Sequence, residues 1–206
     1  MFSPEPLKTI PSSWLELKEE FFSRPAPLVA EDLIGTILLK RTKSGYIGGA
    51  IVETEAYAED DEASHSFKGQ RPHNSSMYGP PGMLYVYRSY GIHWCLNFST
   101  GKKGHGEAVL IRALAATFGT EKMIPGASPQ PIKFCSGPGR LCAALSITRD
   151  HNGLLVGDEI SLWKTSLKED YQIATGQRIG ISKALEKHWR FGIKAHPSLS
   201  KPFPKS

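Results

Sequence analysis

The chain has 206 residues, of which 40% are hydrophobic, and a formal net charge of +5 at pH 7. This apolar content is enough for one domain of ordinary size, and the positive charge favours a polyanionic partner. The three cysteines include no Cys-x-x-Cys pair, which argues against a disulfide framework or a zinc ribbon and indicates a reducing compartment. No apolar run approaches the ~20 residues of a membrane span, and the first residues lack a signal-peptide pattern. We therefore expect a cytoplasmic protein that does not bind membranes, with a single domain over residues 1–206 and a core at about 26–200.

The first half of the chain predicts two helices followed by two strands. Ser13 and Glu16 have the spacing of a capping box, which predicts a helix from Ser13 toward Phe22. Apolar periodicity and turn residues then predict a helix over 26–33 and strands over 35–40 and 46–57. The polar segment 58–82 has no clear periodicity. Because long irregular segments inside a compact domain are usually functional or disordered, and this one follows a strand rich in carboxylates, we expect it to be functional.

The second half of the chain predicts mainly strands. Alternating or continuous apolar runs place them over 84–90, 92–98, 108–114 and 153–163. Ser136, Gly137 and Pro138 are typical of a helix start, since serine or glycine caps the helix and proline is tolerated in its first turn. Residues 164–206 are expected to form mostly loops and short elements.

The predicted strand over 46–57 carries the most informative pattern. Side chains alternate along a strand, so Glu53, Glu55 and Tyr57 should share one face. Such a face is unhelpful for packing and suits a reactive cleft. The charge of one carboxylate should raise the pKa of the other toward the range of a general base. The alternative is a half-exposed strand with two solvated glutamates.

The motifs of several other chemistries are missing from the sequence. It has no phosphate-binding loop, no dinucleotide-binding glycine turn, no Gly-x-Ser-x-Gly elbow and no zinc-deaminase spacing. What remains is the carboxylate pair, an arginine within the apolar run 108–114, and an unusual density of tyrosines. Arg112 would need a charged partner if buried. Aromatic side chains beside basic residues suit stacking on nucleic-acid bases; the tyrosines are Tyr57, Tyr78, Tyr85, Tyr87 and Tyr90.

Several sequence blocks in order closely resemble the alkyladenine (3-methyladenine) DNA glycosylase family. They are Val-Glu-Thr-Glu-Ala-Tyr at 52–57, Ala-Ser-His-Ser at 63–66, Pro-Gly-Met-Leu-Tyr-Val-Tyr at 81–87, Tyr-Gly-Ile-His-Trp-Cys-Leu-Asn at 90–97, Val-Leu-Ile-Arg-Ala-Leu at 109–114, Cys-Ser-Gly-Pro-Gly-Arg-Leu-Cys at 135–142, Arg-Ile-Gly-Ile at 178–181 and Trp-Arg-Phe at 189–191. The resemblance covers roughly residues 30–200. It implies an α+β fold, a single mixed domain with a curved antiparallel β-sheet flanked by helices. It also implies a monomer that excises alkylated or deaminated purines from double-stranded DNA without metal or cofactor.

The resemblance assigns roles to individual residues. Glu55 falls on the general base that activates water, and Arg112 on the arginine that helps hold the water and the phosphate of the flipped nucleotide. Tyr57, His65 and Tyr87 fall on the walls that sandwich the extruded base. Asn97 falls on the pocket residue that collides with a guanine amino group, and Tyr90 falls on the intercalating residue. Three further residues are expected to make weaker DNA contacts: His93, Arg71 and Arg140.

The sequence departs from the family pattern in the loop after His65. Arg71-Pro72-His73-Asn74 replaces the usual Thr-Pro-Arg-Asn, so the phosphate contact of that loop would have to come from Arg71. Ala115-Ala116 replaces a frequent Glu-Pro, and His93 contacts either the complementary strand or solvent. Two other functions remain open from the residues alone: a non-catalytic nucleic-acid-binding module, and a carbohydrate glycosidase that uses Glu53 and Glu55. An acid and base normally flank the bond they cleave, which disfavours the second.

Overall fold

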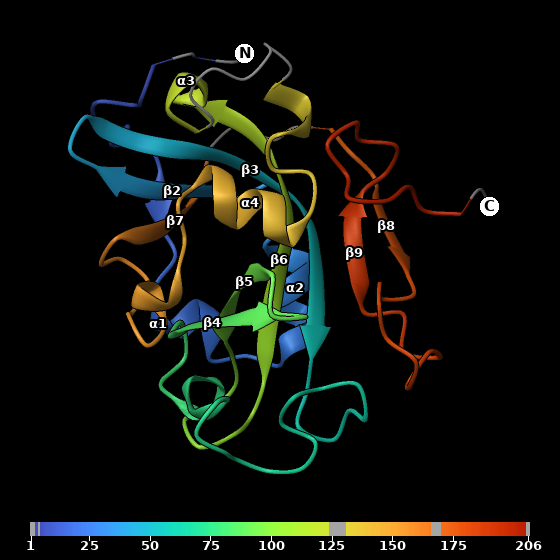
Figure 1. Cartoon of the computed structure of the whole chain (residues 1–206). Coiled ribbons are helices and arrows are strands. Elements are labelled where there is room, and N and C mark those ends of the chain that lie inside the picture. The colour runs from blue at the N-terminus through green and yellow to red at the C-terminus, as the bar shows by residue number, and fades with distance from the viewer. Residues whose placement is uncertain (1–2, 4, 124–130, 166–169, 205–206) are drawn as a thin grey trace.

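The computed structural model describes residues 3, 5–123, 131–165 and 170–204 (Figure 1). Within them, nine strands form one open sheet in which all strand pairs are antiparallel. The main path runs β1 (Leu15–Glu16), β7 (Ile160–Lys164), β2 (Ile37–Thr42), β3 (Gly45–Tyr57), β6 (Ala108–Phe118), β5 (His93–Ser99) and β4 (Leu84–Ser89). Beside it, β9 (Arg190–Ile193) pairs with β3, and β8 (Ile173–Gly176) pairs with β9.

The helical elements of the described residues are short. They are α1 (Glu19–Phe22), α2 (Ala26–Asp32), α3 (Thr120–Met123) and α4 (Pro138–Ala144), with 3₁₀ turns at Ser75–Tyr78, Pro131–Lys133 and Arg149–His151. The sheet and its helices form one mixed domain, so the predicted α+β fold is confirmed. The boundaries of the predicted core, at about 26–200, stay a prediction.

Strand β3 is the longest strand and changes its partner along its length. Residues 45–50 pair with β2, whereas residues 53–55 pair with β9, and β6 pairs along the other edge from residue 48 to residue 57. The register with β6 shifts between Ile51 and Glu53 and again between Glu53 and Thr54. Because such bulges bend a strand and increase its twist, the predicted carboxylates lie at the bend where β9 replaces β2.

The two faces of β3 meet different surroundings. The Thr54 hydroxyl, between the two glutamates, points to the α2 face and donates to the Ala30 carbonyl at 2.8 Å. Figure 1 shows α2 behind the sheet and α4 in front of it.

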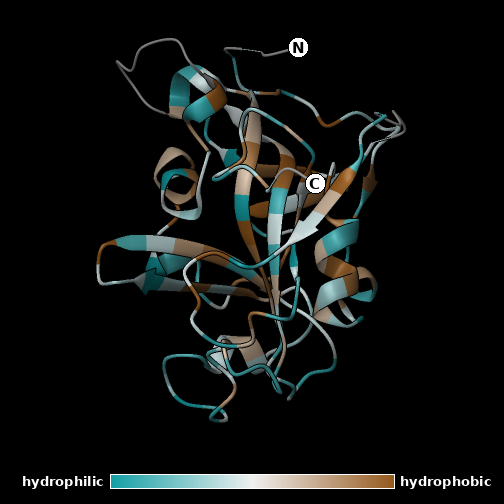
Figure 2. Cartoon of the chain, turned by 90° about the vertical axis from the view of Figure 1, so that its right-hand side faces the viewer, coloured by the Kyte–Doolittle hydropathy of each residue, from teal (hydrophilic) through white to brown (hydrophobic). Residues whose placement is uncertain are grey.

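Apolar residues gather on the strands inside the domain, and the loops of 58–82 at the bottom carry mainly hydrophilic residues (Figure 2). The side chains of Phe22 and Phe98, both fully buried, stack at 5.5 Å between ring centroids.

Two sequence predictions are wrong at the level of single elements. The helix expected from Ser13 begins only at Glu19, because Leu15 and Glu16 pair with β7 and the Leu17 N–H donates to the Leu162 carbonyl. Sheet pairing therefore overrides the local capping pattern. The strand expected over 153–163 is confined to Ile160–Lys164 because a 3₁₀ turn and further turns precede it. The hairpin strands and the helix starts at residues 26 and 138 are confirmed.

Among the described residues, no helix combines the length and the apolar character that a membrane crossing requires.

Candidate active site

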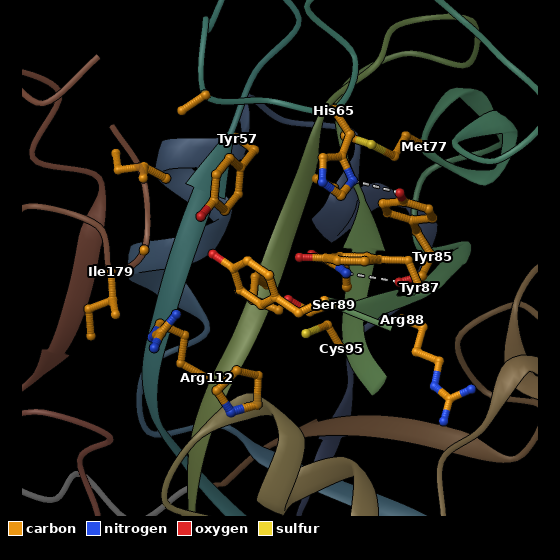
Figure 3. Close-up of a pocket in the computed structure, with 18 residues that line it drawn as sticks. Tyr57, His65, Met77, Tyr85, Tyr87, Arg88, Ser89, Cys95, Arg112 and Ile179 are labelled. Carbon is orange, nitrogen blue, oxygen red and sulfur yellow. Dashed lines mark hydrogen bonds between the residues drawn. The ribbon is translucent and has the colours of Figure 1, made fainter. Parts of the chain in front are cut away.

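A cavity of about 390 Å³ opens beside the C-terminal end of β3, where Tyr57 lines it. Most of the residues that the sequence marked for the base pocket line it, and Glu55 lies directly beneath them. In Figure 3, Tyr57 and Arg112 stand on one side of the cavity, and His65, Tyr85 and Tyr87 on the other. The lining comprises Tyr57, Ala63, His65, Met77, Tyr85, Tyr87, Arg88, Ser89, Tyr90, Cys95, Asn97, Ala108, Leu110, Arg112, Pro138, Ile179, Gly180 and Ile181.

Glu55 is fully buried, and three donors surround its carboxylate. The Ile179 backbone N–H donates to Oε1 at 2.6 Å. The Tyr57 hydroxyl and Arg112 Nη1 donate to Oε2 at 2.8 and 3.1 Å. All three donors belong to residues that line the cavity, so they hold the carboxylate directly beside it.

Burial raises the pKa of Glu55 above its ordinary value, and Arg112, the Ile179 N–H and Tyr57 offset part of that rise. The negative charge of Glu53 raises the pKa further but is the smallest of these contributions. The sequence prediction of a raised pKa is therefore right in direction, but burial rather than the neighbouring carboxylate is its main cause. The alternative of two solvated glutamates is wrong, since neither side chain is exposed.

Arg112 projects from β6 and is nearly buried, and it has the charged partners that its burial demands. Its Nε donates to Glu53 Oε1 at 3.1 Å, and its Nη1 donates to Glu55. Burial lowers the pKa of Arg112, but the two carboxylates outweigh this effect and raise the pKa above its ordinary value. Arg112 is thus a fixed cation at the edge of the cavity.

The aromatic walls come from three separate segments. The ring of His65, in the loop after β3, lies 4.6 Å from that of Tyr87 between centroids, and its Nδ1 is hydrogen-bonded to the Tyr85 hydroxyl at 2.8 Å. Tyr85 and Tyr87 stack at 5.3 Å on one face of β4. Burial, followed by the charge of His73, lowers the pKa of His65, which keeps its ring neutral near pH 7. Burial likewise raises the pKa of both tyrosines, so they keep their protons.

Tyr57 forms the opposite wall and is supported from behind by a buried ion pair. The guanidinium carbon of Arg178 lies 4.7 Å from the centroid of the Tyr57 ring, and the guanidinium is paired with Asp61. Arg178 also donates to the Ala56 carbonyl at 2.9 Å. Because Ile179 follows directly, this pair also fixes the N–H that donates to Glu55.

Asn97 lines the cavity with a fixed orientation. Its Nδ2 donates to the Tyr85 carbonyl at 2.9 Å, and only 4% of the residue is exposed. A rigid side chain at this place can discriminate between purines by shape.

Tyr90 lies at the tip of the β4–β5 hairpin and is 87% exposed. It has a φ of 50°, and Gly91 has a φ of 68°. A non-glycine residue in this left-handed region costs roughly 1–2 kcal/mol. Both positive φ values belong to the tight turn that joins β4 to β5, in which the Ile92 N–H donates to the Ser89 carbonyl at 3.0 Å.

The three residues predicted as weaker DNA contacts do not line the cavity. His93 is exposed, with its side chain against Gly139 of α4. Arg140 is exposed on the same helix, and Arg71 is exposed in the loop, where its N–H donates to the Asn74 side chain at 2.7 Å.

The sequence does not predict two parts of the site. Ile179 belongs to the Arg-Ile-Gly-Ile block, but no pattern predicts that its N–H binds Glu55, and no pattern marks Ser200. The Ser200 hydroxyl accepts from Arg112 Nη2 at 3.2 Å. Among the described residues, no group of three or more His, Cys, Asp or Glu side chains could hold a metal ion.

Comparison with known proteins gives a consistent result. A family model described as methylpurine-DNA glycosylase (MPG) matches residues 20–197. A protein of Bradyrhizobium diazoefficiens is 49% identical over 190 residues, which cover 92% of this chain and 92% of the relative. A protein of Nitrosospira multiformis is 48% identical over 184 residues, 88% of this chain and 92% of the relative. A protein of Rhodopseudomonas palustris is 48% identical over 189 residues, which cover 91% of this chain and 92% of the relative. All three carry the provisional name 3-methyladenine DNA glycosylase.

Proposed function

Because the chain belongs to the methylpurine-DNA glycosylase family, we propose that it flips alkylated or deaminated purines out of duplex DNA and hydrolyses their N-glycosidic bond with a water activated by Glu55. Family membership makes the protein a DNA glycosylase, a monofunctional hydrolase of N-glycosyl bonds in the repair of alkylation damage. The proposed lesions are 3-methyladenine, 7-methylguanine, hypoxanthine and ethenoadenine.

One observation carries the proposal: a buried carboxylate with a raised pKa is hydrogen-bonded to three residues that line a cavity walled by aromatic rings. A volume of about 390 Å³ is within the range of about 300–1,000 Å³ of small-molecule sites. A purine inside a duplex cannot reach such a cavity, so the nucleotide must leave the stack first. This costs a few kcal/mol, and less for a damaged or mispaired base.

The chemistry follows from the charge that develops at the sugar. Breaking an N-glycosidic bond gives C1′ oxocarbenium character, as in other glycoside hydrolyses. Glu55 takes the proton of the attacking water and stabilises the sugar cation. Arg112 keeps Glu55 oriented and directs its remaining N–H groups toward the water and the phosphate of the flipped nucleotide.

The walls of the cavity select the base. The rings of Tyr57, His65 and Tyr87 sandwich it, and the electron-rich tyrosine faces attract the positive charge of an alkylated purine. Asn97 collides with the guanine amino group and so disfavours undamaged guanine, whereas the positive charge of 7-methylguanine favours its binding in spite of this contact. Tyr90 enters the gap left by the flipped base, since a stacked aromatic ring offsets part of the unstacking cost.

Around this site we propose weaker DNA contacts from His93, Arg71 and Arg140. We also propose that the protein acts as a monomer in the cytoplasm, where it meets chromosomal DNA. The carbohydrate-glycosidase alternative is disfavoured because Glu53 and Glu55 bind the same arginine from one side. Two carboxylates so placed cannot flank a bond.

The test is incubation with duplex oligonucleotides that carry one hypoxanthine, ethenoadenine or 7-methylguanine, followed by mild alkali and electrophoresis. We expect strand cleavage at the lesion only after alkali, and none in the undamaged duplex. Binding to all duplexes without base release would instead support the non-catalytic binding module.

A further inference from the structure

Glu53 is fully buried and accepts four hydrogen bonds. Its Oε1 accepts from Arg112 Nε at 3.1 Å, from Arg190 Nε at 2.8 Å and from the Ser200 hydroxyl at 2.8 Å. Its Oε2 accepts from the Ser200 backbone N–H at 2.6 Å. Three of these four bonds converge on Oε1. Arg190 and Ser200 do not line the cavity, so Glu53 is bound mainly from the side away from it, in contrast to Glu55.

Glu53 helps to fix the orientation of the Arg112 side chain. The planar guanidinium donates through Nε to Glu53, through Nη1 to Glu55 and through Nη2 to Ser200. Two contacts from β3 and one from Ser200 fix the plane of the guanidinium, so its rotation would break at least one of them. One N–H on each terminal nitrogen then remains for the cavity that Arg112 lines.

Glu53 also connects β3 to the chain after β9. Arg190, on β9, donates to the Lys201 carbonyl, and its guanidinium carbon lies 4.0 Å from the centroid of the Phe203 ring. Together with Ser200, these contacts fasten residues 200–203 behind Arg112. A segment distant in sequence thus becomes part of the support of the site.

We propose, on the basis of the proposed function, that Glu53 is a positioning residue for base excision: it clamps Ser200 and Arg190 around Arg112 so that the guanidinium meets Glu55 and presents its free N–H groups to the cavity.

The variant Glu53→Gln breaks this clamp while preserving side-chain size. If the amide oxygen takes the place of Oε1, the amide NH₂ faces the Ser200 N–H, and two donors oppose each other. If the amide is reversed, its NH₂ faces Arg112 Nε and Arg190 Nε. Either orientation releases Arg112 or the segment that carries Ser200. A misplacement of about 1 Å can cost on the order of 10²-fold in rate, which is the expected loss of single-turnover excision.

The pH–rate profile distinguishes positioning from mere structural support. Arg112 lowers the pKa of Glu55 more than Glu53 raises it. Release of Arg112 should therefore raise the pKa of Glu55 and move the acidic limb of the profile to higher pH. The polar groups facing Glu55 from the surrounding elements are Arg112 on β6, Tyr57 and Glu53 on β3, the Ile179 N–H, Tyr87 on β4 and Cys95 on β5. The two tyrosines and the cysteine have raised pKa values and stay neutral near pH 7, so Arg112 and Glu53 dominate the shift.

A matched pair of serine variants tests the clamp without removing a charge. Ser200→Ala deletes the hydroxyl that bonds both Glu53 and Arg112 and should shift the limb in the same direction, with a smaller loss of rate. Ser198→Ala is the control, since its buried hydroxyl has no hydrogen-bond partner among the described residues. It should behave as the wild type.

The outcomes are separable. The clamp is supported if both Glu53→Gln and Ser200→Ala excise slowly and if the acidic limb of their pH–rate profiles moves to higher pH. An unmoved limb, or one moved to lower pH at nearly full rate, overturns it, because Glu53 would then be a structural residue or only a neighbouring charge. If Glu53→Gln melts at a much lower temperature than the wild type, the two serine variants decide. Wild-type protein that excises no lesion refutes the proposed function itself.

Discussion

Replacing Tyr90 with serine should slow excision in a way that depends on how well the lesion is paired. Tyr90 is 87% exposed, so removal of its ring leaves no cavity in the fold. Serine at the same positive φ keeps the backbone strain. The free energy of unfolding should therefore change by no more than about 0.5 kcal/mol. A loss of excision larger than this small change in stability would therefore arise from a weaker interaction with DNA.

The size of that effect follows from stacking. A base stacked on an aromatic side chain is worth about 1–3 kcal/mol, so a well-paired lesion should lose roughly tenfold or more in capture of the flipped state. A mispaired lesion has less stacking and pairing energy to overcome, and its loss should be smaller. Tyr90→Phe keeps the ring and serves as the matched control.

The assay is single-turnover excision of hypoxanthine from two duplexes, one with the lesion opposite cytosine, with which it forms a Watson–Crick-type pair, and one with it in a mismatch opposite guanine. Tyr90→Ser should lose more on the paired duplex, and Tyr90→Phe should lose little on either. Equal losses on both duplexes would refute the wedge role and leave a structural tyrosine.

Three further predictions concern the base, the proton and the mechanism. Asn97→Ala should excise undamaged or 7-alkylated guanine more readily while flipping stays normal; unchanged selectivity in competition assays would show that Asn97 does not exclude the amino group. Because burial raises the pKa of Glu55 and the base must be ionised, the wild-type rate should fall as pH drops through a value above that of an ordinary glutamate. A limb at or below the ordinary value would argue against Glu55. Borohydride should trap no protein–DNA adduct during excision, since water is the nucleophile; a trapped Schiff base would indicate an amine nucleophile and a lyase.

Much of the fold could be predicted because local patterns and tertiary contacts agree. The β4–β5 hairpin, β6 with its inward arginine, and α2 with its early proline all follow from periodicity and turn residues. The failure at Ser13 shows the limit. A capping box is a local pattern, whereas Leu15 and Glu16 pair with β7, about 150 residues later in the chain, and no local signal encodes that pairing.

The candidate site likewise has features that a local pattern predicts and contacts with distant segments that it does not predict. Alternation along β3 placed Glu53 and Glu55 on one face, and both bind Arg112. It did not distinguish their surroundings: Glu53 is bound by the distant residues Arg190 and Ser200, whereas Glu55 is bound by Tyr57 and Ile179 at the cavity. Ile179 donates through its backbone, so its side-chain type carried no information about the contact. The site roles given to individual residues stay predictions until the variants are measured.

The most direct measurement compares wild-type protein with Glu55→Gln on one hypoxanthine-containing duplex, with excision and binding recorded on the same samples. General base catalysis is worth about 10²–10⁴-fold, and loss of the negative charge beside the sugar cation should increase the defect. We therefore predict nearly complete loss of excision by Glu55→Gln, with binding to the damaged duplex close to that of the wild type. Excision at close to the wild-type rate by Glu55→Gln would contradict the account and move the catalytic role to another residue.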